Sequence, residues 1–320
     1  MSARPPPDRT ARLGASAWWG VLRRTVRESG EDRLTDWAAA LTYYAMLSVL
    51  PGLLVLVSVL ALLGAPALQP LIDNMDAIAS GPAAELLTEG THSLADAHGY
   101  AGILAAAGVA GTLWAASGYT AAFMRAANTV YDVPEGRPAW KTVPIRLGVT
   151  VVVGLLLAVS ALTVVLTGDL ARRVGEAFGV GPAPVTVWEI VKWPILVGIV
   201  SQLFALLYWA SPNARQGGYR WVSPGGLLAV ALWMLASAGF AAYIANLDPF
   251  NRTYGVLGAV IIFYVWLWTS NLAVLVGAEF DAELHRARAI AAGHPVDSEP
   301  YVELRDTRKL RPVDDDADLG

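Results

Sequence analysis

Hydrophobic residues along this chain gather into six long stretches that contain no Asp, Glu, Lys or Arg. These charge-free stretches cover residues 37–72, 97–124, 147–168, 193–214, 221–247 and 253–278. The shortest has 22 residues, and a helix needs about 20 residues to cross the ~30 Å hydrocarbon layer of a membrane. The pattern therefore predicts six membrane-spanning segments.

The six stretches are predicted to be helices, because in lipid only helices and closed barrels give every backbone polar group a partner. A barrel strand would alternate apolar and polar residues. Residues 151–157 read Val-Val-Val-Gly-Leu-Leu-Leu, which shows no alternation and suits a helix that is apolar all round. We therefore expect an all-α polytopic membrane protein with six transmembrane helices.

Basic residues outside the stretches predict the orientation of the helices. Nineteen of the 23 Lys and Arg residues fall in four segments, which are residues 1–36, 125–146, 211–223 and 279–320. Cytoplasmic loops carry an excess of Lys and Arg, so both chain termini are expected in the cytoplasm. No cleavable signal peptide is expected, because an Arg-rich segment precedes the first stretch and that stretch is too long for a signal peptide.

The composition supports a membrane protein and argues against a water-soluble enzyme. Charged residues make up 16% of the 320 residues and hydrophobic residues 55%, with a mean hydropathy of +0.46. An ordinary soluble domain is about 25% charged. The net charge of −4 is too small to indicate a nucleic-acid partner. The chain has no cysteine, which excludes disulfides, thiolate metal sites and cysteine nucleophiles.

Three parts are expected along the chain. Residues 1–36 form a cytoplasmic leader, in which Trp and Val beside Arg predict an amphipathic helix lying on the inner leaflet. Residues 37–285 form the six-helix transmembrane domain, with an outside loop at residues 64–99. Residues 286–320 form a cytoplasmic, largely disordered tail, in which Gly293 marks the predicted end of the last helix.

Four polar or helix-breaking residues inside the charge-free stretches are candidates for a pathway or hinge: Ser48, Pro51, Gln202 and Asn271. Pro51 removes one helical hydrogen bond, and the resulting kink would be either a hinge beside a substrate path or a static kink held by neighbouring helices. Gln202 would be either a pathway residue or an amide that joins two helices. A transporter should have a polar cavity reaching these residues in the middle of the membrane.

Other patterns favour structural roles over chemistry. Small residues suited to close helix packing share one helix face: Gly111, Ala115, Gly118 and Ala122. One His/carboxylate cluster is better explained as loop residues than as metal ligands: His92, Asp96 and His98. The sequence has no phosphate-binding loop, serine-hydrolase elbow or HExxH motif. No catalytic residue, metal site or cofactor is therefore predicted, and the protein is not expected to be an enzyme.

A series of short motifs runs through the chain from residue 38 to residue 279. They comprise residues 38–44 with Ser48 and Pro51; Trp114, Ser117, Gly118, Asn128 and Tyr131; Tyr208, Pro212 and Asn213; residues 224–226 and Trp233; and residues 254–258 and 277–279. Each motif is weak alone. Their order and spacing resemble the YihY/virulence factor BrkB family of bacterial inner-membrane proteins, over roughly residues 20–285.

The resemblance implies a multi-pass protein of the bacterial plasma membrane that transports or exports an envelope component or small molecule. Its expected partners are the lipid bilayer and a lipid or small-molecule substrate. The first alternative is a non-transporting scaffold or assembly factor in cell-envelope biogenesis. A ribonuclease is a less favoured alternative, although members of the family have carried the label ribonuclease BN, which we interpret as a misassignment. No oligomeric state and no nucleic-acid partner are predicted.

The resemblance also places polar residues together at the cytoplasmic side of the helices. The candidate cluster comprises Arg125, Asn128, Tyr131, Arg146, Asn213 and Glu279. These residues would either form a functional site or cap helices and anchor loops. Glu279 follows the last charge-free stretch, where an acid is unfavourable with the helix dipole unless the helix continues or a cation meets it. Arg125 or Arg146 is the expected cation.

Overall fold

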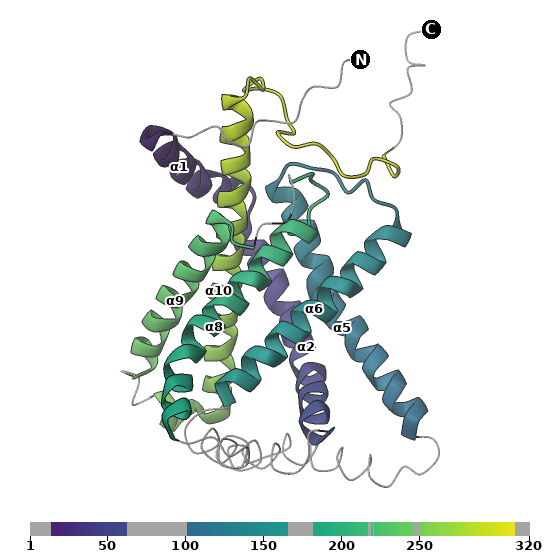
Figure 1. Cartoon of the computed structure of the whole chain (residues 1–320), viewed down its shortest axis with the longest axis vertical. Coiled ribbons are helices and arrows are strands. Elements are labelled where there is room, and N and C mark those ends of the chain that lie inside the picture. The colour runs from purple at the N-terminus through teal and green to yellow at the C-terminus, as the bar shows by residue number, and fades with distance from the viewer. Residues whose placement is uncertain are drawn as a thin grey trace. The chain divides into compact units, whose positions relative to one another are not determined.

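The protein is mainly helical in the part that a computed structural model describes, which comprises residues 14–62, 101–165, 182–216, 219, 221–245 and 250–310. The helices described there are α1 (Ala15–Glu31), α2 (Leu34–Leu62), α5 (Ala101–Val130), α6 (Ala139–Val165), α8 (Pro182–Ala210), α9 (Pro224–Ala245) and α10 (Phe250–Ala291) (Figure 1). A single backbone bridge between Ala214 and Leu304 is the strand-like pairing among these residues. The expected outside loop at residues 64–99 lies outside the described residues.

Four of the described helices are long and apolar enough to cross a membrane. The spans are Ala139–Val164, Ile190–Ala210, Pro224–Ile244 and Val260–Ala291. Large apolar side chains are exposed on these helices: Leu235 on α9 is 72% exposed and Ile190 on α8 is 69% exposed. Such surface is unfavourable in water and favourable against lipid. The all-α membrane fold is therefore confirmed, while six spans and cytoplasmic termini stay predictions.

The chain divides into two compact units. Unit 1 contains Met1–Tyr43, Thr120–Val149 and Val200–Gly320, and unit 2 contains Tyr44–Tyr119 and Thr150–Ile199. All six candidates for the polar cluster belong to unit 1. The functional site is therefore built within that unit.

In unit 1, two glycines allow α9 and α10 to pack with their backbones in contact. A Cβ on Gly225 would lie 2.1 Å from the carbonyl oxygen of Gly277, and a Cβ on Gly277 would lie 2.5 Å from that of Gly225. Any larger residue would push the helices apart, which is the reason that small residues serve at close helix crossings in membranes. Gly225 also donates its backbone N–H to Asp281 Oδ1 at 2.7 Å, so α10 caps the first turn of α9.

Helix α1 packs along the C-terminal half of α10. Val21 is buried against Phe280 and Leu284, and the ring of Trp18 stacks on that of Phe280 at 6.0 Å. The other face of α1 exposes Trp19 and other apolar side chains beside its arginines. Burial of one apolar face fixes α1 on α10, so α1 brings its charged residues next to those of α10.

Positive backbone angles mark three chain turns in unit 1. Gly293 has a φ of 92° directly after α10 ends at Ala291, which confirms the predicted helix end and its glycine cap. Arg33 has a φ of 52° between α1 and α2, and Asp132 has a φ of 50° after α5. At the last two turns, Asp32 follows the end of α1 and Asp132 follows the end of α5.

In unit 2, part of the predicted small-residue face makes a close contact. A Cβ on Gly118 of α5 would lie 3.0 Å from the Tyr44 ring of α2, whereas one on Gly111 would meet nothing within 4 Å. Gly118 therefore allows an aromatic ring to approach α5, and Gly111 has no such role among the described residues.

Candidate functional site

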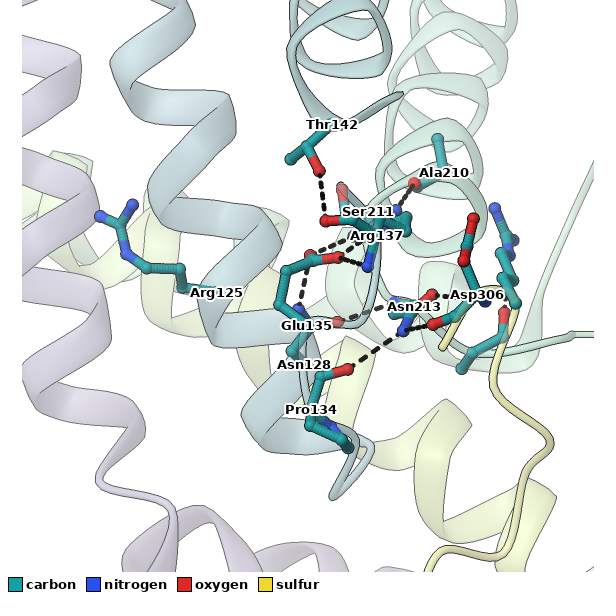
Figure 2. A network of polar contacts seen from close by, with 12 residues as sticks. Arg125, Asn128, Pro134, Glu135, Arg137, Thr142, Ala210, Ser211, Asn213 and Asp306 are labelled. Atoms are coloured by element: carbon teal, nitrogen blue, oxygen red, sulfur yellow. Dashed lines mark hydrogen bonds and ion pairs between the residues drawn. The ribbon is translucent and has the colours of Figure 1, made fainter. Parts of the chain in front are cut away.

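Two of the predicted cluster residues, Asn128 and Asn213, form the centre of a buried polar network in unit 1 (Figure 2). Asn128 lies in the last turn of α5, and its Oδ1 accepts the backbone N–H of Asn213 at 2.7 Å. The Asn213 side chain is fully buried and donates to the carbonyl oxygens of Pro134 and Asp306 at 3.1 and 2.9 Å. Asn213 Oδ1 also accepts the backbone N–H of Asp306 at 3.1 Å. The two amides thus join the α5–α6 connection, the segment after α8 and the C-terminal segment.

An arginine that the sequence analysis did not single out completes this network. Arg137 is 2% exposed, and its guanidinium pairs with Glu135 through Nε and Nη2 at 2.8 and 2.7 Å. Nη2 also donates to the carbonyl oxygen of Ser211 at 2.7 Å, directly after α8 ends. Burial alone would raise the pKa of Glu135, but the hydrogen bonds and charge of Arg137 outweigh burial and lower it. The pair therefore stays ionised and satisfies backbone carbonyls at the end of α8.

The C-terminal segment is held against this network mainly through backbone groups. Arg305 donates its backbone N–H to the carbonyl oxygen of Asn213 at 2.9 Å and its Nε to that of Ala214 at 2.7 Å. Asp306 forms an ion pair with Lys141 at the start of α6. A Cβ on Gly136 would lie 2.1 Å from the Asp306 carbonyl oxygen, so only glycine admits the segment there. Much of the segment for which disorder is expected thus has defined contacts, and residues 311–320 lie outside the described residues.

A second feature of unit 1 is a cavity of about 240 Å³ that is lined mostly by acidic side chains. It lies where the ends of α1 and α5 meet α10 and the segment after it. We call it the acidic cavity; seven of its thirteen lining residues are carboxylic acids, namely Glu28, Glu31, Asp32, Asp132, Glu279, Glu283 and Glu299. Arg286 is the basic residue among those that line it. The cavity therefore carries a large excess of negative charge.

Arginines pair with three of these carboxylates, of which Glu31 contacts Arg27 at 3.4 Å. Glu28 contacts Arg27 at 2.6 Å and Arg24 at 3.4 Å, and Glu283 contacts Arg24 at 2.7 Å and Arg286 at 3.6 Å. The ion pairs found in the described part of the chain do not include Asp32, Asp132, Glu279 or Glu299. These four side chains are therefore the acids of the cavity without a cationic partner in the described part of the chain.

Glu279 is the most buried acid of the cavity. It is 2% exposed, and its Oε2 has no hydrogen-bond partner among the described residues. The charged groups that act on it are other acids, chiefly Asp32, Glu283 and Glu28. The buried hydroxyl of Tyr131, which also lines the cavity, likewise has no partner there. The Nε of Arg286 is a third such atom, so three residues that line the acidic cavity each have a buried polar atom with free bonding capacity.

The expected pairing of Glu279 with an arginine does not occur in the described part of the chain. Arg125 is exposed, and Figure 2 shows its side chain on the side of α5 opposite the polar network. Arg146 is half-buried on α6. Helix α10 runs on to Ala291, twelve residues past Glu279, so Glu279 is not at a helix end. The helix continues past Glu279, so this acid does not lie at the negative end of the helix dipole and needs no cation on that account.

Two carboxylates at the rim of the cavity have perturbed acidities. Burial, together with the charges of Glu28 and Glu31, raises the pKa of Asp32 to about 6. Burial, together with the charges of Glu299 and Asp32, raises the pKa of Asp132 to about 6. Both groups thus change charge near neutral pH, and a cation in the cavity would favour their ionised forms.

The four pathway candidates fall in different units. Asn271 on α10 is buried and donates its Nδ2 to Thr42 Oγ1 on α2 at 3.0 Å. Gln202 on α8 is half-buried, and both residues belong to unit 1. Ser48 in unit 2 donates its hydroxyl to the Tyr44 carbonyl oxygen at 2.8 Å, one turn earlier in α2. Pro51 lies in α2, and its side chain is outside the described residues.

The acidic cavity could not be predicted from the sequence, because its lining residues come from four segments that lie far apart along the chain. A local signal was present in two like-charged pairs four residues apart, Glu28 with Asp32 and Glu279 with Glu283. Like charges at this spacing destabilise an isolated helix. Two such pairs therefore indicate positions at which a requirement other than helix stability, such as a binding site, favours the acids.

The fold and site define an integral membrane protein of the all-α class with a charged cavity at the ends of several helices. The chain belongs to the virulence factor BrkB family, whose model matches residues 25–300. It is similar to the ribonuclease-like protein YfkH of Bacillus subtilis, with 25% identity over 81% of this chain and 92% of that protein. It is also similar to a UPF0761 membrane protein of Vibrio vulnificus, with 27% identity over 84% of each chain.

A UPF0761 membrane protein of Ralstonia nicotianae is 27% identical over 82% of this chain, which spans 58% of that longer protein. No solved structure matches the chain. Bacterial membrane relatives and several apolar helices identify a multi-pass protein of the bacterial inner membrane. Within the described residues, no three His, Cys, Asp or Glu side chains are grouped closely enough to hold a metal ion.

Proposed function

We propose that this protein transports or exports a small molecule or an envelope component across the bacterial inner membrane. The observation that carries the proposal is the acidic cavity, which is lined by Glu279 with its buried, unpartnered Oε2. Leaving a buried polar atom without a hydrogen bond costs about 1–3 kcal/mol, and more for a charged group. Such a cost is typical of sites that bind something.

The position of Glu279 on α10 supports transport over a purely structural role. It lies within Val260–Ala291, a segment apolar enough to cross a membrane. Glu279 is the first of several ionisable residues that follow the apolar part of this segment, and buried ionisable residues in membrane helices mark substrate or ion pathways. Eight residues earlier on α10, the buried amide of Asn271 adds a second polar group, roughly 12 Å away at 1.5 Å per residue.

Orientation is part of the proposal. With six spans and both termini in the cytoplasm, the acidic cavity would open to the cytoplasm. The arginines of α1 support this orientation, because basic residues gather on the cytoplasmic side. Trp19 is 69% exposed beside these arginines, which suits a helix lying on the inner leaflet.

A non-transporting scaffold in envelope biogenesis is the second candidate. The polar network of Asn128, Asn213 and Arg137 supports it, because these buried groups hold three chain segments in one arrangement. Segments held in a fixed arrangement would suit the docking of other proteins. It does not account for the open bonding capacity of Glu279, so transport is the better supported function.

Transport is tested with the purified full chain in liposomes. Uptake of radiolabelled agmatine and flipping of a fluorescent phospholipid would be compared with protein-free vesicles. We expect one of them to move faster with the protein, and Glu279→Gln to reduce that rate at least tenfold. Glu303→Gln is the matched control, because Glu303 is exposed outside the cavity. No acceleration of either probe, or equal rates for Glu279→Gln and wild type, would overturn the proposal.

A further inference from the structure

The acidic cavity has room for more than a single ion. Its volume of about 240 Å³ is several times the ~30 Å³ that one water occupies in the liquid. The described carboxylates are also not grouped closely enough to coordinate a metal ion directly. A ligand that contacts several of these acids at once must therefore span the distance between them.

The open polar groups of the cavity define the chemistry of its ligand. In its ionised form Glu279 only accepts hydrogen bonds, so a cationic donor at Oε2 would favour that form over the protonated acid. The neighbouring acids Asp32, Asp132 and Glu299 have no arginine or lysine partner among the described residues, which favours a donor with positive charge. Charge-assisted hydrogen bonds are roughly twice as strong as neutral ones, so a cation with N–H groups would be bound best.

The cavity wall already binds one group of this kind. The guanidinium of Arg286 lies over the ring of Tyr301 at 4.5 Å and contacts Glu28 and Glu283 at 3.9 and 3.6 Å. An aromatic face with two carboxylates is a suitable environment for a planar cation. Arg286 pairs with Glu28 and Glu283 through Nη1, although its buried Nε has no hydrogen-bond partner among the described residues. The ion pairs of the described residues do not include Glu279, Asp32 or Asp132.

We propose that the acidic cavity binds a small organic cation that carries ammonium or guanidinium N–H donors, one of which bonds to Glu279 Oε2. This proposal rests on the proposed transport function, because it names the class of molecule that would enter the cavity from the cytoplasmic side. Asp32 and Asp132 provide the remaining negative charge, and Tyr131 offers its hydroxyl as acceptor or donor.

Binding is tested on the full chain in lipid nanodiscs by isothermal titration calorimetry at pH 7.5 and low salt. Agmatine is the probe, because it carries an ammonium group at one end and a guanidinium at the other. We expect saturable binding to one site that Glu279→Gln weakens at least tenfold. Glu299→Gln, an exposed position at the rim, should weaken binding about threefold even if Glu279→Gln impairs folding. Glu303→Gln should bind like wild type.

Two further probes separate N–H recognition from general attraction to negative charge. Tetramethylammonium has the charge without N–H donors and should bind at least tenfold more weakly than agmatine. Mg²⁺ should not displace agmatine at equal concentration. Absence of saturable binding, equal affinity for tetramethylammonium, or unchanged affinity in both Glu279→Gln and Glu299→Gln would overturn the proposal.

The binding and transport measurements can overturn the cation site and the transport function independently of each other. Agmatine binding without transport of any probe would keep the cation site and remove the transport function. Phospholipid flipping without agmatine binding would keep transport and remove the cation site.

Discussion

Arg24 on α1 pairs with Glu283 on α10 across 259 residues of sequence, with 2.7 Å between Nε and Oε2. The pair gives Glu283, which lines the acidic cavity, a cationic partner. Glu279, one turn earlier on the same helix, has no such partner in the described part of the chain and is less exposed. Two acids four residues apart thus have opposite roles: one holds α1 in place, and the other keeps its bonding capacity open.

The contact between α9 and α10 should depend on the absence of a side chain at Gly277. A Cβ added there would lie 2.5 Å from the Gly225 carbonyl oxygen and 2.6 Å from Tyr208 Oη. We expect Gly277→Ala to lower the free energy of unfolding by about 1–3 kcal/mol, as overpacked positions do. Thermal unfolding in detergent would measure the loss. Gly148→Ala is the control, because a Cβ there meets nothing within 4 Å; equal midpoints for both variants would contradict the packing argument.

Asn213 should hold the C-terminal segment in place. Asn213→Ala removes its side-chain bonds to Pro134 and Asp306, and it leaves buried backbone groups without partners. We expect a loss of about 1–3 kcal/mol in stability, together with faster proteolytic cleavage between residues 295 and 310. Limited proteolysis followed by mass spectrometry measures the cleavage. Thr307→Ala, at an exposed position of the same segment, should be cleaved at the wild-type rate.

The Arg137–Glu135 pair should be expensive to break from the arginine side. Arg137→Leu leaves Glu135 without its cation and the Ser211 carbonyl without its donor. We expect a destabilisation of about 3 kcal/mol, the lower end of the range for broken buried ion pairs, because Glu135 is partly exposed. Adding Glu135→Gln should recover part of it in a double-mutant cycle of denaturation midpoints. Arg215→Leu, at an exposed position, should change stability by less than about 0.5 kcal/mol.

Asn271 can be assigned to a pathway or to helix association by one pair of variants. Its Nδ2 donates to Thr42 Oγ1 at 3.0 Å, and hydrogen bonds between membrane helices contribute about 0.6 kcal/mol on average. If association is the whole role, Asn271→Leu and Thr42→Val should lower stability by similar amounts and leave transport rates unchanged. A transport loss confined to Asn271→Leu would identify it as a pathway residue.

The acidic cavity should make stability fall as pH rises towards neutrality. Asp32 and Asp132 have pKa values of about 6 in the folded protein, against an ordinary value of 3.8. The folded state therefore holds these protons more tightly than the unfolded state. Their stabilising contribution is complete below about pH 4 and is lost as pH rises through 6.

The pH effect is measured by thermal unfolding of wild type and the double variant Asp32→Asn/Asp132→Asn between pH 5 and 7.5. Wild type should lose more stability over this range than the double variant. Other charged groups line the same cavity, namely Glu28 and Glu31 on α1, Glu279, Glu283 and Arg286 on α10, and Glu299 in the tail. They remain in both proteins, so the difference reports on the two aspartates. Identical pH profiles would show that neither aspartate has a raised pKa.

The sequence alone determined that this is an all-α protein of the membrane, and it identified the residues by which the family is recognised. Charge-free length and the absence of alternation are local properties, and the energy of lipid contact depends on them directly. The end of α10 at Gly293 was equally local, since a glycine at the end of a helix needs only its own backbone freedom. Asn128 and Asn213, which the sequence places at the same level in the membrane, are joined by a hydrogen bond in the structure.

Only the tertiary structure decided which charges meet. The sequence analysis gave Glu279 a basic partner, whereas packing of α1 on α10 surrounds it with Asp32, Glu28 and Glu283. The sequence predicts a largely disordered tail, whereas Arg305 donates to the backbone carbonyl of Ala214 and Asp306 donates its backbone N–H to Asn213 Oδ1. No local sequence pattern predicts these two contacts. Electrostatic partners are set by distances between segments far apart in sequence, and those distances exist only after the helices have packed.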